Sequence, residues 1–360
     1  MNPQENSRME QARINARAHL EKTAINSDNS VDEDIVEDNT SDSEKRLIEK
    51  LKRELGVVCL NALNDPEVIE IMLNSDGILW VEKLGSAMTR VGVMQESKSK
   101  ALIGTIASYL NTTVTPDNPI LECELPIDGS RFEGLLPPVV ARPTFTIRKK
   151  ATKIFTLDEY LEGAIINKDQ YDLIAKAIYD PADLHHTRRN ILIVGSTGSG
   201  KTTLTNAVID GMVKATSDDR IVIIEDTAEI QCSARNSVIL RATNKVNMLT
   251  LLKATMRLRP DRILVGEVRG REALDLLKAW NTGHSGGVAT VHANSAKAGL
   301  IRMEQLISEA TTAPMHTLIA EAINVVIYIA KTQTGRVVKE IIEVVGYDKQ
   351  KEDYILKEYR

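Results

Sequence analysis

The sequence has few cysteines, with only Cys59, Cys123 and Cys232 in 360 residues, and they lie far apart. Because no two of them form a CxxC pair, the spacing indicates neither a disulfide framework nor a zinc site. Such sparse use of cysteine is typical of a reducing cytoplasm. No apolar run approaches the length of a membrane-spanning helix, and the N-terminus lacks the apolar core of a signal peptide, so we expect a soluble chain.

The chain also lacks a strong net charge, since 45 Lys and Arg residues stand against 50 Asp and Glu residues. Residues 1–44 hold 11 of the acids and 4 of the bases, which leaves 39 acids and 41 bases in the rest. A near-neutral body provides no electrostatic footprint for duplex nucleic acid.

The N-terminal 44 residues are predicted to be an acidic disordered tail. Thr23–Glu44 contains eight acids, no base and no aromatic residue, so it has little apolar surface to offset the entropy of ordering. A short helix is expected over Met9–Leu20. We favour a solvated extension, and a docking arm is the alternative.

The length accommodates two ordinary domains. We predict a first α+β domain over residues 45–140, a linker over residues 141–150 and a second domain over residues 151–360. The segments expected to build the first domain are helices over Glu44–Leu55, Asp65–Leu73 and Ser97–Leu110 and strands over Ile78–Val81, Val91–Met94 and Leu121–Ile127. An extended segment, Phe145–Arg148, is expected inside the linker.

One segment of the second domain fits the P-loop pattern GxxxxGK[ST] at every fixed position. Its residues are, in order, Gly195, Ser196, Thr197, Gly198, Ser199, Gly200, Lys201 and Thr202. A phosphate chain needs inward-pointing amides, a mobile cation such as Lys201, and a hydroxyl such as that of Thr202 for Mg²⁺. A buried strand is predicted before the loop, and a helix, whose N-terminus attracts anions, is predicted from Thr203. The segment therefore predicts a nucleotide site.

Two further predicted strands end in acids. Ile221–Ile224 is followed by Glu225 and Asp226, and a second strand ends at Glu267. A parallel strand beside the P-loop strand places such acids where open α/β sheets bind ligands, although strand-end acids also form turns. About sixty residues after a P-loop, Glu267 is typical of a residue that holds Mg²⁺ through water or orients the attacking water.

A glycine-rich segment leads into a strand expected to end near His292, after Gly283 caps the helix Arg271–Thr282. A histidine at a strand end can contact a γ-phosphate or its attacking water; a buried, hydrogen-bonded histidine is the alternative. We assign no role to His185 and His186.

Several arginines surround the second acidic strand, and guanidinium groups suit the γ-phosphate oxygens. The sequence does not decide which of them contact phosphate: Arg257, Arg259, Arg262, Arg269 and Arg271. Arg131, just beyond a turn at Asp128–Gly129, is on its own interpreted as a surface charge.

Together these segments resemble the secretion ATPases of type II and type IV systems. The resemblance spans roughly residues 45–345 and is greatest to the conjugal-transfer ATPases of type IV systems. It rests on the P-loop followed, in order, by Ile224–Thr227, Arg257–Arg262, Gly266–Arg269 and Gly283–Asn294, and on Leu136–Pro138 and Phe145–Lys149 before it. Three scattered cysteines cannot build the four-cysteine zinc site of type II assembly members, and Ala298–Glu304 differs from the motif of pilus-retraction members.

The resemblance implies a fold, an activity and partners. The expected fold is α/β, with a small α+β (PAS-like) N-terminal domain that swivels on a RecA-like P-loop domain in a hexameric ring. The expected activity is ATP hydrolysis with Mg²⁺, powering pilus biogenesis or DNA–protein transfer. The expected partners are other copies in a homo-hexamer and inner-membrane components of a type IV secretion apparatus, without sequence-specific nucleic-acid binding. The expected location is the cytoplasm, peripherally at the inner membrane.

The resemblance also assigns roles to individual residues. Lys201 and Thr202 match the Walker A pair, and the loop with Thr203 holds the nucleotide. Arg131 and Arg148 fall where the family's arginines reach the phosphates, which changes the interpretation of Arg131. The implied catalytic set is Lys201, Glu225, Glu267, His292, Arg148 and Arg131, with His284 as a second histidine, and the implied metal set is Thr202, Glu225 and Glu267.

Three other functions remain open at this point. They are a type IV pilus-type assembly motor, a DNA-dependent translocase, and a structural ring that binds ATP without hydrolysing it. Basic DNA-facing loops are expected of a translocase, and the near-neutral body disfavours it.

Overall fold

The computed structural model describes residues 42–83, 86–150, 154–183, 187–243, 245–332 and 335–359. The chain divides into two compact units, residues 1–46 and residues 47–360. Of the first unit, only residues 42–46 are described, at the start of helix α2 (Asp42–Asn64). Almost all of the predicted tail, the helix expected over Met9–Leu20, and His185 and His186 lie outside the described residues. The expected tail and domain boundaries therefore stay predictions.

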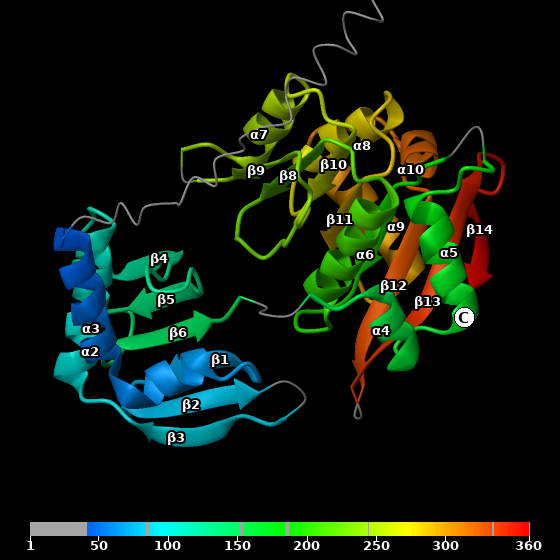
Figure 1. The fold of residues 1–360 in the computed structure, drawn as a ribbon. Coiled ribbons are helices and arrows are strands. Elements are labelled where there is room, and N and C mark those ends of the chain that lie inside the picture. Colours follow the sequence, from blue (N-terminus) through cyan, green and yellow to red (C-terminus); the bar gives the residue numbers. More distant parts are fainter. Residues whose placement is uncertain are drawn as a thin grey trace, which may run out of the picture. The chain divides into compact units, whose positions relative to one another are not determined.

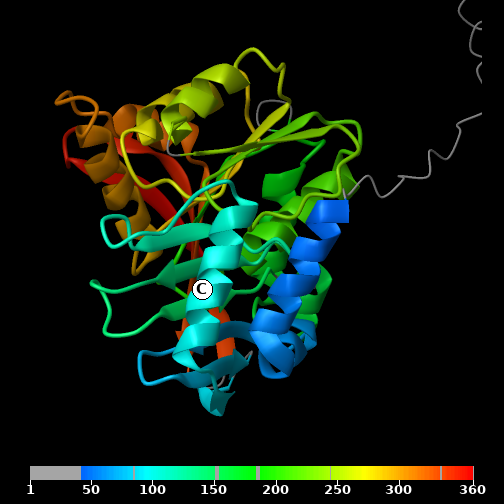
Figure 2. The same ribbon diagram turned by 90° about the vertical axis from the view of Figure 1, so that its left-hand side faces the viewer.

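The second unit begins with a six-stranded antiparallel sheet. Its strands are β1 (Val68–Leu73), β2 (Ile78–Lys83), β3 (Thr89–Val93), β4 (Ile120–Glu124), β5 (Arg131–Leu135) and β6 (Thr144–Arg148), in the order β3-β2-β1-β6-β5-β4. Helices α2 and α3 (Glu96–Tyr109) lie side by side along it (Figures 1 and 2). Leu51 and Leu55 of α2 and Ile103 of α3 pack in one core with Phe132 and Ile147 of the strands.

Most elements predicted for this region are present, but one is wrong. The helix expected to run from Asp65 to Leu73 is strand β1, which pairs with β2 on one side and β6 on the other. Val68, Ile69 and Ile71 are β-branched, and a helix restricts their side chains, whereas a strand with two neighbours packs them well. The segment Phe145–Arg148, expected in the linker, is strand β6 in the middle of this sheet.

A second, mixed sheet of eight strands follows. Its strands are β7 (Ile191–Val194), β8 (Ile221–Glu225), β9 (Ser237–Arg241), β10 (Arg262–Val265), β11 (Val288–Val291), β12 (Val325–Thr332), β13 (Gly335–Asp348) and β14 (Asp353–Tyr359), in the order β14-β13-β12-β7-β11-β10-β8-β9. Strands β12, β7, β11, β10, β8 and β9 are parallel neighbours, and β13 and β14 add an antiparallel edge. The predicted strands before and after the P-loop are thus confirmed. However, β8 is not beside β7, because β11 and β10 lie between them.

Helices cover both faces of this sheet (Figure 1). They are α4 (Leu157–Glu162), α5 (Lys168–Ile178), α6 (Lys201–Ala215), α7 (Met248–Thr255), α8 (Glu272–Asn281), α9 (Ala296–Ser308) and α10 (His316–Ala322). Alternate residues of β7 divide between two cores: Ile191 and Ile193 pack with α4, α5 and α6, and Leu192 and Val194 pack with α7 to α10. This burial on both faces explains the continuous apolar runs of the parallel strands. No helix in the described part of the chain is long and apolar enough to cross a bilayer.

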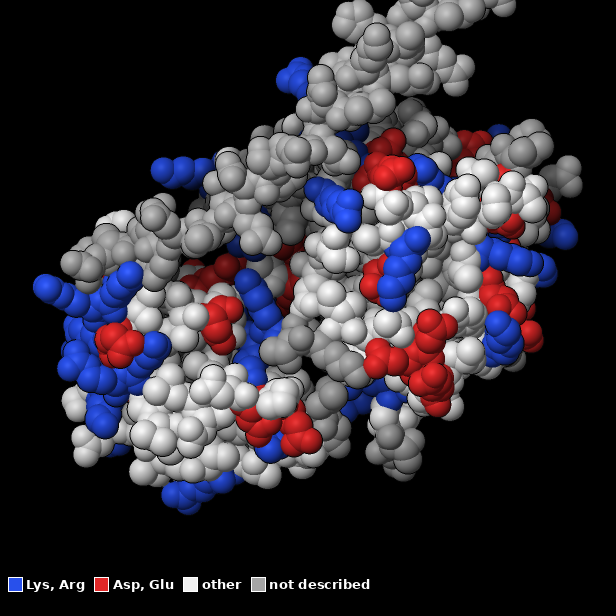
Figure 3. All heavy atoms as spheres, viewed as in Figure 1, with Lys and Arg blue, Asp and Glu red and all other residues white. Residues whose placement is uncertain are grey.

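Charged side chains of both signs share the surface. On the face in view, Lys and Arg side chains gather at the left edge, over α2 and α3, whereas basic and acidic groups are mixed elsewhere (Figure 3). Several are paired on their own helix, as are Lys168 with Asp172 on α5 and Lys214 with Asp210 on α6. These pairs agree with the near-neutral charge of the sequence beyond residue 44.

A buried guanidinium group ties together the amino ends of the parallel strands. Arg262, at the start of β10, is completely buried, and its Nε donates to Asp219 at 2.7 Å. Its other nitrogens donate to the carbonyl of Gly286 at 2.9 Å and to the carbonyl of Ile178 at 3.0 Å. Asp219 also accepts from Arg188 at 2.6 Å. One side chain thus links the end of α5 to the segments that precede β8 and β11.

Arg262→Ala should therefore lower the free energy of unfolding by about 3–5 kcal/mol, because it leaves the carboxylate of Asp219 buried with only one partner. Urea unfolding followed by circular dichroism measures the change. Arg257→Ala removes an exposed arginine from the same motif and should stay within about 0.5 kcal/mol of the parent. Equal losses in the two variants would contradict a structural role specific to Arg262.

Candidate functional site

The P-loop (residues 195–202) joins β7 to α6 through glycines that no other residue can replace without strain. Gly198 and Gly200 have φ values of 71° and 97°, and Gly200 is the N-cap of α6. A Cβ on Gly195 would lie 2.4 Å from the Ser199 hydroxyl and 2.5 Å from the Ile329 carbonyl. The loop can therefore wind tightly over the end of the sheet with its amides at the helix N-terminus, which is a site for anions.

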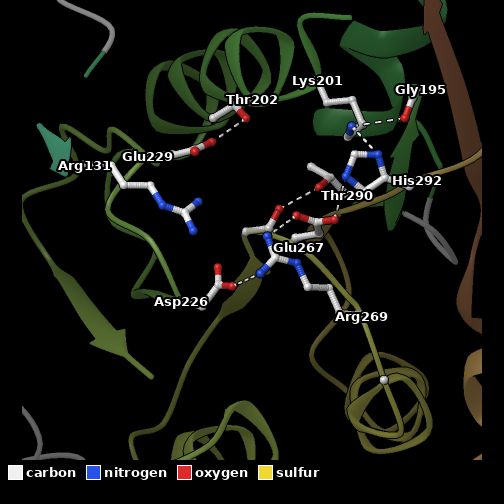
Figure 4. Close-up of polar contacts among 12 residues, drawn as sticks. Arg131, Gly195, Lys201, Thr202, Asp226, Glu229, Glu267, Arg269, Thr290 and His292 are labelled. Atoms are coloured by element: carbon white, nitrogen blue, oxygen red, sulfur yellow. Dashed lines mark hydrogen bonds and ion pairs between the residues drawn. The ribbon is translucent and has the colours of Figure 1, made fainter. Parts of the chain in front are cut away.

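Lys201 lies inside this loop, with 9% of its surface exposed. Its Nζ donates to the carbonyls of Gly195 and Ser196, both at 3.0 Å, and contacts Nδ1 of His292 at 3.1 Å (Figure 4). Burial lowers the pKa of Lys201, and the nearby carboxylates of Glu267 and Glu229 oppose that shift. The ammonium group is thus held where a phosphate would meet it.

A chain of polar contacts leads from Lys201 across the ends of three strands (Figure 4). Because an ammonium group only donates, Nδ1 of His292 must accept, so the proton of the ring is on Nε2. Nε2 then donates to Glu267 at 2.9 Å. Arg269 joins the other oxygen of Glu267, at 2.7 Å, to the carboxylate of Asp226. The predicted Glu267 and His292 are therefore in direct contact, at the ends of β10 and β11.

A second carboxylate, which sequence reasoning missed, stands at the Walker A hydroxyl. Oγ1 of Thr202 donates to Glu229 at 2.9 Å, and Glu229 lines the same cavity as Lys201. The sequence signal was present, since Glu229 follows Asp226 by three residues. The sequence does not show, however, that the loop after β8 bends and turns Glu229 back toward α6.

Glu225 is placed differently from the other acids. It is only 1% exposed, and its Oε2 accepts from the backbone amides of Glu229 and Ile230 at 3.1 and 3.0 Å. Burial raises the pKa of Glu225, although these two bonds oppose the shift. Its Oε1 is buried without a hydrogen-bond partner among the described residues. One oxygen of Glu225 thus fixes the loop that carries Glu229.

Most of the predicted site residues meet at one cavity of about 240 Å³. Those that line it are Arg131, Arg148, Thr197, Gly198, Lys201, Thr202, Glu225, Glu267 and His292, together with Asp226, Glu229 and Arg269. Gly200 and Thr203 line an adjoining second cavity of about 460 Å³. Gly195, Ser196, Ser199 and His284 line neither of these two cavities. Of the five undecided arginines, only Arg269 lines the site.

Arg131 of β5 and Arg148 of β6 are directly opposite each other in the sheet. Such like charges opposite each other repel, and here each is offset by a glutamate. Arg148 donates to Glu70 at 2.6 Å, and Arg131 donates to Glu122 at 2.7 Å. Two paired guanidinium groups that line a cavity favour an anion there.

The donor set suits a hard cation that arrives with its ligand. In the described residues, no group of three or more His, Cys, Asp or Glu side chains forms a preformed metal site. Mg²⁺ is usually held by one or two protein oxygens together with substrate phosphates and water. The hydroxyl of Thr202 and the carboxylate of Glu229 fit that pattern.

Comparisons with known proteins agree with this geometry. A family model described as type II/IV secretion system protein matches residues 60–345. The probable conjugal transfer protein TrbB of Sinorhizobium fredii is 51% identical over 302 residues, which cover 84% of this chain and 91% of that protein. The conjugal transfer protein TrbB of Rhizobium radiobacter is 48% identical over 305 residues, which cover 85% and 92% of the two chains.

A solved structure supports the fold class. The X-ray structure of the Legionella pneumophila ATPase DotB superposes with a TM-score of 0.57 at 19% identity and covers 85% of this chain and 81% of that chain. At this identity the likeness concerns the fold alone. The predicted α/β class is thereby confirmed.

Proposed function

Because the chain belongs to the family of type II/IV secretion system proteins, we propose that it hydrolyses ATP as the motor of a type IV secretion or conjugative transfer apparatus. The observation that carries the proposal is the Lys201 ammonium group held in a glycine loop and in contact with His292, which in turn contacts Glu267. The relatives named as conjugal transfer proteins support the conjugative assignment. In this role the motor powers pilus biogenesis, DNA–protein transfer, or both.

The P-loop binds the phosphate chain of ATP. The amides at the N-terminus of α6 cradle the phosphates, and Lys201 exchanges its contacts with the Gly195 and Ser196 carbonyls for β- and γ-phosphate oxygens. This exchange costs little, because the ammonium group is already desolvated and already in place. Thr203 contributes the next amide of the helix.

The hydroxyl of Thr202 and the carboxylate of Glu229 beside it would hold Mg²⁺ together with phosphate oxygens. When bound, the ion neutralises phosphate charge. The expected metal role of Glu267 stays a proposal: each of its oxygens accepts one hydrogen bond, from His292 or Arg269, and keeps a second lone pair. Glu225 supports this arrangement by fixing the loop of Glu229.

Hydrolysis takes place beside Glu267 and His292. Glu267 orients the attacking water or accepts its proton. The contacts from His292 and Arg269 hold the carboxylate of Glu267 in one orientation. Arg269 adds positive charge near the γ-phosphate and is kept in place by Asp226. When a phosphate takes over Lys201, Nδ1 of His292 becomes free to accept a new hydrogen bond, so the histidine senses the γ-phosphate.

The motor works as a homo-hexameric ring in which a PAS-like N-terminal domain swivels on a RecA-like domain. Arg131 and Arg148 reach the phosphates from the N-terminal sheet, so nucleotide binding sets the angle between the two domains. A ligand that contacts one arrangement more strongly shifts the equilibrium by that difference in binding free energy. Inner-membrane components of the apparatus receive the motion, and the ring itself makes no sequence-specific contact with nucleic acid.

Lys201→Ala should lower ATP turnover at least about a hundredfold, because it removes the cation that meets the developing charge. A phosphate-release assay with Mg²⁺ measures turnover. Lys214→Ala, at the exposed far end of α6, is the matched control and should retain turnover. The proposal would be wrong if Lys201→Ala kept a third or more of the parent activity.

The same assay with added DNA separates the alternatives. A motor of this kind should turn over without DNA and gain little from it. Strong dependence on DNA would indicate a translocase, and nucleotide binding without any phosphate release would indicate a structural ring.

Glu267→Gln should reduce turnover about a hundredfold or more while nucleotide affinity stays close to that of the parent. Glutamine keeps the shape of the side chain and one of its two acceptor oxygens but loses its charge and basicity. Affinity is measured by titration calorimetry with ADP. Glu229→Gln is the contrast, because it should raise the Mg²⁺ concentration needed for half-maximal turnover. A collapse of affinity in Glu267→Gln would instead make Glu267 a binding or structural residue.

Turnover per protomer should rise with protein concentration as rings assemble, and mass photometry should find six protomers. Arg148→Ala should lower turnover about tenfold without changing assembly, because one charge-assisted contact to phosphate is lost. Arg142→Ala removes an exposed arginine just before β6 that lines neither cavity, and should leave both properties intact. A fully active monomer would contradict the ring.

A further inference from the structure

The hairpin of β12 and β13 packs directly against the P-loop, on the side away from Glu267. The Ile329 carbonyl of β12 would lie 2.5 Å from a Cβ on Gly195, and Cδ of Arg336 would lie 2.7 Å from a Cβ on Gly200. The absence of side chains at both glycines thus lets the hairpin approach the loop backbone.

Arg336, the second residue of β13, has a guanidinium group with unused donors. Among the described residues its one hydrogen bond runs from Nη2 to the Gly198 carbonyl at 3.4 Å, which is long for such a bond. Its Nε is shielded from solvent and has no partner within the described residues. No acidic side chain pairs with Arg336 in that part of the chain, whereas most other arginines near the site have a carboxylate.

Arg336 is also paired across the hairpin with a second base. Lys331 of β12 is its directly opposite residue, and both side chains line the second cavity. Gly200, Thr203 and Asn206, from the first turns of α6, line that cavity too. Opposed like charges are unfavourable in a hairpin, so this position favours an anion between the hairpin and the start of α6.

The cationic side chains of Lys201 and Arg336 approach the P-loop from opposite sides. Strand β7 has β11 on one side and β12 on the other (Figure 1). Lys201 contacts His292, which follows β11, whereas Arg336 comes from the β12 hairpin. A P-loop lysine reaches the β- and γ-phosphates, and the loop amides cradle the α- and β-phosphates. The side of β12 is therefore left for the part of the nucleotide nearer the nucleoside.

We propose that Arg336 binds the α-phosphate of the nucleotide, with Lys331 adding positive potential. This inference rests on the proposed nucleotide-binding function and adds to it a residue from the far C-terminal part of the sheet. Because ATP and ADP share the α-phosphate, Arg336 contributes equally to the binding of both. It therefore acts on affinity and leaves the chemical step at Glu267 unchanged.

Arg336→Met tests the proposal in the full chain. Methionine keeps the aliphatic packing over Gly200 but removes the charge. Titration calorimetry should give weaker binding of ADP and of a non-hydrolysable ATP analogue by one common factor of about tenfold or more, as expected for one charge-assisted hydrogen bond. KM should rise by a similar factor with kcat nearly unchanged. Lys339→Met, an exposed lysine on the same strand, is the matched control.

Inorganic tripolyphosphate separates a phosphate contact from a nucleoside contact. Its binding should weaken in Arg336→Met if the guanidinium group holds a phosphate. Unchanged tripolyphosphate binding with weakened ADP binding would place the contact on the sugar or base and overturn the proposal. If the methionine variant does not fold, Arg336→Gln, which keeps a polar side chain without the charge, is measured in the same way.

Failure of the proposed function and failure of the role of Arg336 give different results. A parent protein that binds neither ADP nor tripolyphosphate would refute the proposed function itself. A parent that hydrolyses ATP, beside an Arg336→Met variant that binds ADP with parental affinity, would refute the role of Arg336 alone. A purely structural role would lower the unfolding midpoint and kcat without a common loss of ADP and tripolyphosphate affinity.

Discussion

The buried ion pair of Arg262 and Asp219 is the constraint on which the arrangement of the parallel strands depends. A buried guanidinium group stabilises a fold only when its partners are in place, and its desolvation offsets much of the Coulomb attraction. Its partners here come from the end of α5, from Gly286 and from the segment before β8. Alternative strand arrangements would leave that charge unpaired. The group therefore specifies one alignment of β8, β10 and β11, and that alignment brings Asp226, Glu267 and His292 together at the opposite ends.

Positive charge surrounds the P-loop on two sides, and each cation has a distinct environment. Lys201 is desolvated and fully engaged with carbonyls and with His292, so it is fixed before any ligand arrives. Arg336 is only weakly bonded and comes from a hairpin more than 130 residues later in the sequence. This arrangement suits a chain of phosphates that runs from the β12 side to the β11 side.

The sequence predicted those parts of the site that local patterns encode. A P-loop shows in eight consecutive residues, and strand-end acids such as Glu267 show at the ends of apolar runs. Local patterns failed where pairing between distant strands decides the secondary structure. Residues 65–73, predicted as a helix, contain strand β1 because two neighbouring strands pair with it. Local patterns also left Arg262 among five equivalent arginines, since burial at the amino end of a strand has no local signature. Arg336 was missed because only the topology of the sheet brings β13 next to the P-loop.

The glutamates that hold Arg131 and Arg148 have a consequence for the end of the proposed cycle. Tight binding by two free arginines would hold ADP and phosphate as firmly as ATP and would slow their departure. Glu70 and Glu122 compete for the same guanidinium groups, at 2.6 and 2.7 Å. Once orthophosphate has left, the remaining ligand carries less negative charge than ATP, and these carboxylates can reclaim the arginines. In the proposed cycle, the competing pairs would thereby assist the release of ADP.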